Sequence, residues 1–485
     1  MELLIRIYAA RKVIFSAFVL YLLMMAGLLF LTTECHVSGT DCGSNAGRAL
    51  RPILGYLSTG MLIDSYFPTQ AFTENPLGFA VVGYLFGVQD GVRQFLPVVL
   101  LQIVLLFASG MLVYGVTSEF WPRAAKVAML FLIFNPNVIF VTLQPREDIY
   151  FAFFICLAMA AAFSFAKSWT WSSAIICGAA LGLSANFRPT GHYLIYVIPV
   201  VFLVFGAMSE QSGRVFEGLK KGVVAAAVGW ILIVPWMMHL KTAGHSFSLT
   251  DYRGKYMWSS DFHAMLADYE EREVGLYEAL FGAYDDRSRK VHLNTFGPER
   301  TLVLAQTIPN WSGLAPNKKL KLQYEDMMQQ FGEFSASTYF FAALPNWRYF
   351  FLSGGEGELF WTMGVHDRLE EWRDENSWTF LGLKSTFIGY SVLIKILAVF
   401  GLWHLYKIRN YEGLLMFAGV LFYFMLVHIY HGSPRYRVPV ESIFAILAAC
   451  GLVSIRDISQ GRRDGDISPP TANQGAIPTP GGTQR

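Results

Sequence analysis

The chain has 485 residues, of which 54% are hydrophobic and only 15% are charged, and its formal net charge is +2 at pH 7. Soluble domains usually carry about a quarter charged residues. The apolar residues here form blocks close to the ~20 residues that cross the hydrocarbon core of a bilayer. This composition excludes an ordinary soluble domain and indicates a polytopic membrane protein. No basic run suggests a nucleic-acid partner.

The first apolar block follows three basic residues, Arg6, Arg11 and Lys12. A secretory signal peptide begins in a similar way. However, residues 13–31 are longer than a typical signal-peptide core, and no clean small-x-small cleavage site follows them. We therefore expect a first membrane span that is retained.

Ten apolar blocks predict ten membrane spans, and the expected fold class is an all-α polytopic membrane protein. The predicted spans are roughly 13–33, 94–117, 124–143, 148–166, 172–188, 192–208, 222–240, 386–406, 411–429 and 437–455. If Met1 is cytoplasmic, every loop on the inner side carries Lys or Arg, as the positive-inside rule requires. We therefore expect both termini in the cytoplasm.

Two long segments then face outward and divide the chain. Residues 1–240 form an N-terminal transmembrane region with a first outer loop at 34–93, and 241–385 form an extracytoplasmic, mainly helical domain. Within them, residues 75–88 predict a re-entrant or interfacial helix, too short to span. Residues 318–331 predict an amphipathic helix. Residues 386–455 supply the last spans, and 456–485, rich in Gly and Pro, form a tail that we expect to be disordered.

The first outer loop is unusually acidic. It carries Glu34, Asp41, Asp64 and Glu74. Asp41 precedes a probable helical turn, so it also suits a helix N-cap. Cys35 and Cys42 bracket Asp41 and could form a disulfide in an oxidising compartment, although spacing alone does not establish one. The other cysteines, Cys156, Cys177 and Cys450, lie in apolar blocks and are expected in the core.

Several arginines lie in short outer loops, on the side where the positive-inside rule expects few. They are Arg146, Arg188, Arg435 and Arg437. A single outer Arg is often an anchor that reaches lipid headgroups. Their convergence on one face instead favours an anion site, because a guanidinium can hold a phosphate through two hydrogen bonds.

Other polar residues near these loops have more than one interpretation. Glu147 suits either a helix N-terminal charge or a site residue. Lys395 lies in the middle of a predicted span and either pairs with a carboxylate or reaches a lipid phosphate. His192 lies in an outer loop without zinc-ligand spacing. The sequence contains no P-loop, no GxSxG and no Rossmann fingerprint.

The outer-face motifs resemble those of the GT-C superfamily of membrane glycosyltransferases, in particular bacterial relatives of protein O-mannosyltransferases and of the lipid A aminoarabinose transferase. The resemblance covers nearly the whole membrane region and is carried by Thr40-Asp41, Asp64–Tyr66, Asn75–Phe79, Asn135-Pro136, Pro145, Glu147, Phe187–Pro189, Pro235-Trp236 and Arg435–Glu441.

The resemblance implies a sugar donor carried on a polyprenyl phosphate and an active site at the outer face of the bacterial cytoplasmic (inner) membrane. A hexose or pentose would pass with inversion to an acceptor hydroxyl, whose proton a carboxylate accepts. Asp41 is the implied base, with Glu34 and Glu74 as reserves. The implied phosphate ligands are Arg188, Arg435, Arg437 and Arg146, and the implied substrate contacts are Glu147, Asp64, His192 and Tyr436.

Other functions and partners stay open at this point. A transporter or flippase of lipid-linked sugars could also use outer arginines, and a non-catalytic scaffold of envelope assembly is a third possibility. The first-loop carboxylates could hold a divalent cation through oxygen ligands. The sugar and the glycan, lipid or protein acceptor are not specified by any motif.

Overall fold

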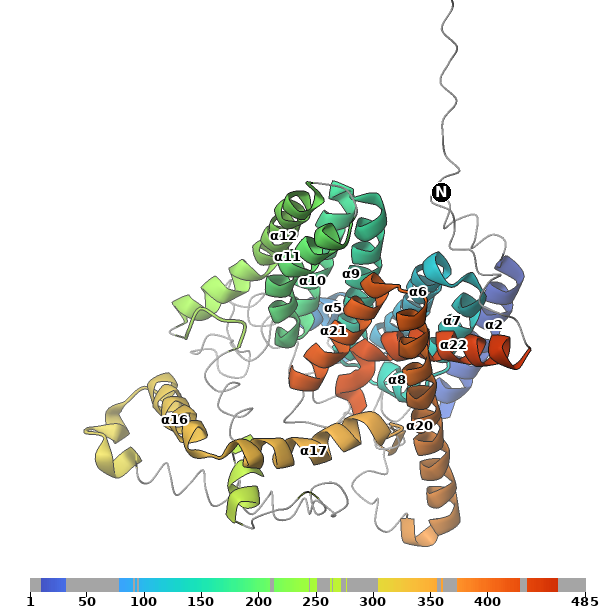
Figure 1. Cartoon of the computed structure of the whole chain (residues 1–485). Coiled ribbons are helices and arrows are strands. Elements are labelled where there is room, and N and C mark those ends of the chain that lie inside the picture. The colour runs from blue at the N-terminus through green and yellow to red at the C-terminus, as the bar shows by residue number, and fades with distance from the viewer. Residues whose placement is uncertain are drawn as a thin grey trace, which may run out of the picture.

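Helices make up nearly all of the regular structure in the computed structural model (Figure 1). The structure describes residues 10–31, 78–89, 92–93, 96–209, 213–243, 245–250, 262–263, 265–271, 276, 304–355, 359–360, 373–427 and 434–460. The membrane-length and shorter apolar helices are α2 (Arg11–Leu31), α6 (Leu96–Phe120), α7 (Pro122–Ile133), α8 (Pro136–Thr142), α9 (Asp148–Ser168), α10 (Trp171–Phe187), α11 (His192–Met208), α12 (Arg214–Thr242), α20 (Ser377–Lys407), α21 (Tyr411–Val427) and α22 (Val438–Ser459).

The remaining elements are short or lie outside the apolar blocks. They are α5 (Gly78–Gly87), the antiparallel strands β1 (Val88–Gln89) and β2 (Val92–Arg93), the 3-10 helices η1 (Pro189–Gly191), η2 (Trp311–Gly313), η3 (Phe331–Glu333) and η5 (Pro434–Arg437), and the helices α16 (Pro316–Gln330) and α17 (Ala336–Leu352). The predicted short helix near 75–88 and the predicted helix at 318–331 are both present, as α5 and α16.

Each of the ten predicted spans coincides with a helix or a bent helix pair. Within the described ranges, seven helices are long and apolar enough to cross a membrane, and the pair α7–α8 is an eighth candidate. The remaining two, α10 and α21, are apolar helices of 17 residues each. Length and composition therefore establish a multi-pass membrane protein with seven to eight candidate spans.

Three predicted boundaries differ from the observed helices by four residues or more. Helix α12 begins at Arg214 rather than at 222, and α20 begins at Ser377 rather than at 386. Helix α22 continues to Ser459, so the first residues assigned to the tail are helical. The predicted bounds followed hydropathy, but a helix continues through polar residues as long as its backbone hydrogen bonds do.

The α7–α8 pair is bent by 49° at a short break. Asn135 ends the break, and its side chain accepts a hydrogen bond from the backbone N–H of Val138. Pro136 occupies the first helical position of α8, where its missing N–H costs nothing. The sequence Asn-Pro therefore starts a new helix inside the bundle, and the side chain of Asn135 lies at its N-terminus.

Small residues allow two helix pairs to pack closely. A Cβ added to Gly178 or Gly182 of α10 would lie within 3.0 Å of the α12 backbone. Gly401 of α20 and Gly451 of α22 are equally close to each other's helix, at the carbonyl oxygens of Leu447 and Leu397. Helix association in lipid depends on such close backbone packing.

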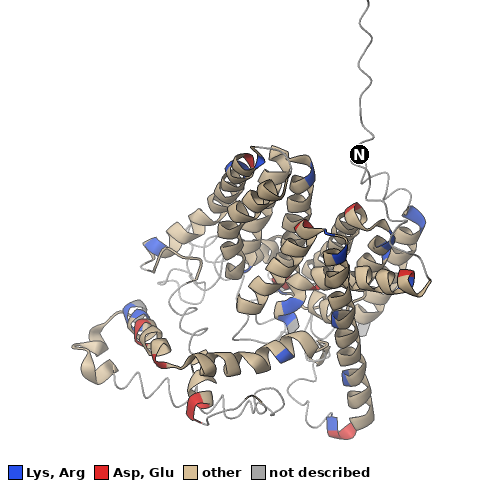
Figure 2. Ribbon diagram, in the orientation of Figure 1, with Lys and Arg blue, Asp and Glu red and all other residues tan. Residues whose placement is uncertain are grey.

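The two ends of the bundle differ in charge chemistry. Helix α2 runs antiparallel to α6, because Phe18 packs on Phe107 while Tyr21 donates to the carbonyl of Ile103. The start of α2 therefore lies near the α6–α7 junction, where Arg123 pairs with Asp457. We name this end of the bundle, which carries Arg123 and Lys167, the basic end. Figure 2 shows that most charged residues lie toward helix ends.

Helix α17 lies beside the opposite end of the bundle, across the direction of α20, and α16 lies farther out (Figure 1). Helix α17 is anchored to the bundle, since the indole N–H of Trp347 donates to the carbonyl of Met425 at 3.1 Å. Part of the region predicted as a mainly helical outer domain is thus helical and contacts the membrane bundle.

Candidate functional site

The acidic first loop cannot be placed, because residues 32–77 lie outside the described residues. This applies to Asp41, Glu34, Glu74 and Asp64, and to the pair Cys35 and Cys42. Their roles stay predictions. Cys156, Cys177 and Cys450 are buried and free, as expected for core residues.

The arginines predicted to converge lie in two neighbouring groups. The first, named the arginine cluster, forms where α9 begins, α10 ends and η5 precedes α22. Its residues are Arg146, Glu147, Asp148, Arg188, Arg435 and Tyr436. Helix α9 separates this cluster from Lys167 at the basic end, so the two ends of one span carry different charge groups.

Arg188 is the centre of the arginine cluster. It is the C-cap residue of α10, only 7% exposed, and its Nη2 forms ion pairs with Asp148 and, at 3.4 Å, with Glu147. One nitrogen thus bridges two carboxylates. Arg188 Nε and Asp148 Oδ2 have no hydrogen-bond partner among the described residues. The cluster therefore keeps hydrogen-bonding capacity for a further polar group.

Tyr436 joins Arg188 to Arg435. The guanidinium carbons of Arg188 and Arg435 lie 4.8 and 4.7 Å from the centroid of the tyrosine ring. Arg435 Nη2 also donates to the phenolic oxygen of Tyr436 at 2.7 Å. A cation within ~6 Å of an aromatic ring is attracted to its electron-rich face. Tyr436 therefore helps to hold two like charges in one small volume.

The formal charges of the arginine cluster do not balance. Three guanidinium groups act on two carboxylates, because Arg146 and Arg435 also lie close enough to influence Glu147 and Asp148. Burial alone would raise the pKa of Glu147, but Arg188 and then Arg435 hold that pKa below its ordinary value. Glu147 therefore stays ionised. Counted over the described residues alone, guanidinium groups outnumber carboxylates in the cluster by one, which favours an anion.

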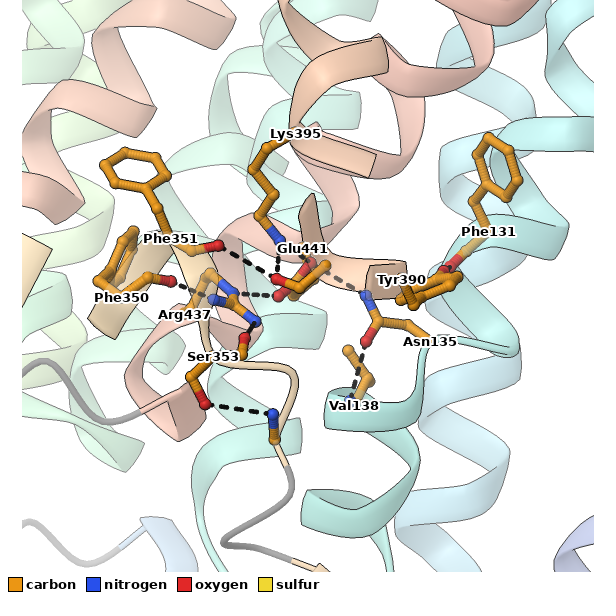
Figure 3. A network of polar contacts seen from close by, with 12 residues as sticks. Phe131, Asn135, Val138, Phe350, Phe351, Ser353, Tyr390, Lys395, Arg437 and Glu441 are labelled. Carbon is orange, nitrogen blue, oxygen red and sulfur yellow. Dashed lines mark hydrogen bonds and ion pairs between the residues drawn. The ribbon is translucent and has the colours of Figure 1, made fainter. Parts of the chain in front are cut away.

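The second group, named the buried network, contains Asn135, Lys395, Arg437 and Glu441 (Figure 3). Arg437 is 1% exposed and Glu441 is fully buried. Arg437 donates from Nε to Glu441, from Nη1 to the carbonyl of Phe350, and from Nη2 to the carbonyl of Ser353 at 2.8 Å. The Arg437 guanidinium is thus occupied by protein acceptors on three sides.

Glu441 gathers the donors of the buried network. Its Oε2 accepts a hydrogen bond from Asn135 Nδ2 at 3.0 Å and lies 3.6 Å from Lys395 Nζ. Lys395 also donates to Ser391 Oγ and lies 4.5 Å from the centroid of Phe444. Of the two alternatives for Lys395, internal pairing with a carboxylate is the one observed.

His192 begins α11 one 3-10 turn after Arg188. Its Nδ1 lies 2.6 Å from the carbonyl oxygen of Pro189, and its ring packs against Tyr193 at a centroid distance of 3.8 Å. These contacts are with its own chain neighbours. Across the described ranges, no three His, Cys, Asp or Glu side chains gather closely enough to hold a metal ion.

Sequence reasoning did not assign Asp148 or Glu441 to the site. Both lie in the first turn of an apolar helix. A carboxylate there is stabilised by the helix dipole, so its presence does not by itself indicate an ion pair. The useful signal was spacing. Glu441 lies four residues after Arg437, and an i,i+4 pair faces the same side of a helix. Asp148 directly follows Glu147, so one Arg can reach both carboxylates.

No protein-family model and no curated protein matches the chain. Several solved structures are similar. The oligosaccharyltransferase from Archaeoglobus fulgidus, in complex with zinc and sulfate, matches with a TM-score of 0.48 and 13% identity over 90% of this chain. The match covers 50% of the oligosaccharyltransferase, so this chain spans about half of its length.

ArnT from Cupriavidus metallidurans, bound to undecaprenyl phosphate, matches with a TM-score of 0.36 and 14% identity, over 93% of this chain and 79% of ArnT. With TM-scores below 0.5, neither match transfers a residue role to this chain. Both matches extend over about nine tenths of this chain.

Proposed function

We propose that the chain is a glycosyltransferase that moves a hexose or pentose from a polyprenyl-phosphate donor to an acceptor hydroxyl. The observation that carries this proposal is the arginine cluster. Arg146, Arg188 and Arg435 come from three separate segments and meet around two carboxylates where apolar spans end. Lipid-linked phosphates are presented where spans end, and guanidinium groups gathered at this level favour an anion.

The depth of Arg188 suits a headgroup phosphate. Helix α10 has 17 residues, which rise about 25 Å at ~1.5 Å per residue. The hydrocarbon core is ~30 Å thick, so a span that starts at the basic end brings Arg188 slightly below the opposite surface. A polyprenyl chain lying among the spans would bring its phosphate to the same level.

The charge of the cluster suits the chemistry of a phosphodiester leaving group. A polyprenyl-phosphate sugar carries one negative charge, which matches the excess positive charge of the cluster. When the bond between the anomeric carbon and the phosphate oxygen breaks, that oxygen takes the electron pair and the phosphate gains a second charge. Fixed guanidinium groups at the developing charge lower the barrier. Arg188 and Arg435 are the proposed ligands, and Arg146 adds to the field.

The acceptor oxygen attacks the anomeric carbon from the side opposite the phosphate, with inversion, and its proton passes to a carboxylate. Asp148 and Glu147 are both engaged with Arg188. We assign the buried Asp148 to positioning the guanidinium, and Glu147 to offsetting part of the positive charge of the cluster. Asp41 of the first outer loop is the proposed base, with Glu34 and Glu74 as alternatives and Asp64 as a substrate contact. A divalent cation at these carboxylates is part of the same hypothesis.

The proposed topology has ten crossings, both termini in the cytoplasm and the arginine cluster outside. Support comes from the basic end, which carries Arg123 and Lys167 and to which both the start of α2 and the end of α22 belong. Positive charge marks the cytoplasmic ends of spans. The proposed location is the cytoplasmic membrane of a bacterium.

The first experiment measures binding of undecaprenyl phosphate to the purified chain in nanodiscs. Arg188→Ala is expected to weaken binding at least tenfold, or about 1.4 kcal/mol. Arg123→Ala is the matched control, because this Arg is also ion-paired but lies at the basic end with its side chain 59% exposed. Equal affinity of Arg188→Ala and the wild-type protein would remove the phosphate role of the cluster.

The second experiment measures transfer. Synthetic undecaprenyl-phosphate-linked hexoses and pentoses are supplied with a membrane extract as the acceptor source, and released undecaprenyl phosphate is measured. Asp41→Asn is expected to lose the ~10²–10⁴-fold contribution of a general base while membrane insertion stays normal. Asp374→Asn, at an exposed position, is the control. If no donor is consumed by the wild-type chain, the transferase proposal fails.

A further inference from the structure

Arg437 and Arg435 are two residues apart but have different surroundings. Arg435 faces the arginine cluster through Tyr436, whereas Arg437 donates to one carboxylate and two backbone carbonyls. A guanidinium with all its sides occupied by protein acceptors has little capacity left for a phosphate. Its contacts instead fix the position of the segment on which Arg435 and Tyr436 lie.

The two carbonyls that Arg437 meets belong to the C-terminal end of α17. The last carbonyls of a helix have no intrahelical donor and carry the negative end of the helix dipole. Arg437 satisfies the carbonyl of Phe350 and that of the C-cap residue Ser353. An Arg at this position donates hydrogen bonds to terminal carbonyls and places a positive charge at the negative end of the dipole, and both effects are favourable. The end of α17 is therefore joined to the start of α22.

The chain leaves α17 through a tight passage against two further elements. A Cβ at Gly354 would lie 2.2 Å from the backbone of Phe387 in α20, and Gly355, with φ of +91°, lies against Asn137 of α8. Helices α8, α17 and α22 all contact η5. Four elements thus meet around Arg437, and the short η5 cannot shift without disturbing several of them.

We propose that the buried network is a positioning device for the arginine cluster: Glu441 and Asn135 hold Arg437, and Arg437 fixes η5 so that Arg435 and Tyr436 face Arg188. Arg437 is accordingly a positioning residue and not a phosphate ligand. This inference rests on the proposed function only for its ligand. The placement of η5 by Arg437 can be tested without any ligand.

The test compares variants of the purified chain in nanodiscs, with undecaprenyl phosphate as the probe. Glu441→Gln keeps the size of the side chain but removes the carboxylate charge. It is expected to weaken probe binding about tenfold, although no atom of Glu441 is proposed to touch the probe. A purely structural role would lower the folded yield or the unfolding temperature and leave the affinity of the folded protein unchanged, which would overturn the inference.

A second variant keeps the inference testable if Glu441→Gln does not fold. Asn135→Ser retains an N-cap residue for α8, since Ser and Asn cap helices about equally well, but it removes the amide that donates to Glu441. We expect a smaller loss of affinity, roughly threefold. Wild-type affinity in folded Asn135→Ser would equally contradict the inference.

The control is Glu217→Gln. Glu217 also forms an i,i+4 pair with a cation, Lys221, but at the basic end, so probe affinity should not change. Backbone hydrogen exchange supplies a readout that needs no ligand. Glu441→Gln should speed exchange in residues 435–438 and at the end of α17, whereas Glu217→Gln should not.

The outcomes separate the two proposals. If the wild-type chain does not bind the probe, the proposed function fails, and hydrogen exchange alone decides the positioning role. If Arg188→Ala loses binding while Glu441→Gln and Asn135→Ser both keep it and show unchanged exchange, the positioning role is wrong and the proposed function stands.

Discussion

The arginine cluster and the buried network place similar residues in contrasting environments. In the arginine cluster, three cations surround two carboxylates, and buried polar atoms of Arg188 and Asp148 remain without hydrogen bonds among the described residues. In the buried network, Arg437 has three protein acceptors, and Glu441 gathers Arg437, Lys395 and Asn135. The first arrangement suits a ligand, and the second suits a joint between helices.

The comparison teaches that a misplaced Arg near a membrane surface has at least two uses. Arg435 and Arg437 are identical in type and nearly adjacent, so sequence alone treats them alike. Their difference depends on what the rest of the chain brings to them. The C-terminal end of α17 brings two backbone carbonyls to Arg437, while α9 and α10 bring carboxylates and another Arg toward Arg435.

The largest expected effect is the loss of stability when Arg437 is replaced. Arg437→Met removes one member of a fully buried ion pair and leaves Glu441 and two carbonyls short of a donor, which should cost about 3–5 kcal/mol of unfolding free energy. Arg435→Met should cost much less stability and mainly weaken undecaprenyl phosphate binding. Denaturant unfolding and probe titration of both variants check the contrast. Equal stability losses at the two positions would contradict it.

A smaller effect is expected at the passage out of α17. Gly355 has φ of +91°, and a residue with a Cβ in the left-handed region costs roughly 1–2 kcal/mol. Contact with Asn137 adds to that cost. Gly355→Ala should therefore lower the unfolding temperature. Gly332→Ala is the control, because a Cβ there meets nothing within 4 Å, and a similar loss in both variants would refute the strain at Gly355.

The smallest expected effect is a change in probe affinity when one charge of the arginine cluster is removed. Glu147→Gln removes a partly exposed carboxylate and should tighten probe binding by about 0.5–1 kcal/mol, the range of a solvent-exposed ion pair. The depressed pKa of Glu147, caused by Arg188 and Arg435 against the effect of burial, gives the matching pH dependence. Any stability from these pairs is present above the ordinary carboxyl pKa and is lost as pH falls through the lower folded value.

Protonation of Glu147 in acid should therefore tighten probe binding of the wild-type chain relative to that of Glu147→Gln. The comparison is made at the same pH, because the phosphate monoester of the probe itself loses a charge at about pH 6. The variant Glu147→Gln should lack this component. Titrations at two pH values, one near neutrality and one below the depressed folded pKa of Glu147, measure the difference between the wild-type chain and the variant. A wild-type chain whose affinity falls in acid while that of Glu147→Gln rises would contradict the assignment.

The sequence predicted the membrane helices well, because an apolar block of sufficient length has few alternatives to a helix in lipid. It also predicted that Arg146, Arg188 and Arg435 share one face, since the positive-inside rule makes outer arginines conspicuous. It did not separate Arg435 from Arg437. That distinction requires contacts between residues hundreds of positions apart, such as the bond between Asn135 and Glu441, which are 306 positions apart.

The bend between α7 and α8 was also missed. Asn135-Pro136 was noticed as a motif, but residues 124–143 were predicted as one continuous span. The apolar pattern continues through the break, so hydropathy does not register it. Pro at the first turn of a helix and Asn before it are start signals, and they were the only local trace of the bend. The roles of the first-loop acids stay predictions.

The buried network joins residues that are far apart in the sequence, and this affects the order in which the protein assembles. Spans enter a membrane in order as the chain is synthesised, from the N-terminus onward. Asn135 and Lys395 come earlier in the chain than α22, and both contact Glu441 in that helix. Until α22 arrives, an amide and an ammonium group lack their shared carboxylate inside an apolar bundle. Insertion of α22 therefore completes the buried network, and a nascent chain halted before residue 434 should be recognised by quality-control proteases as unfinished.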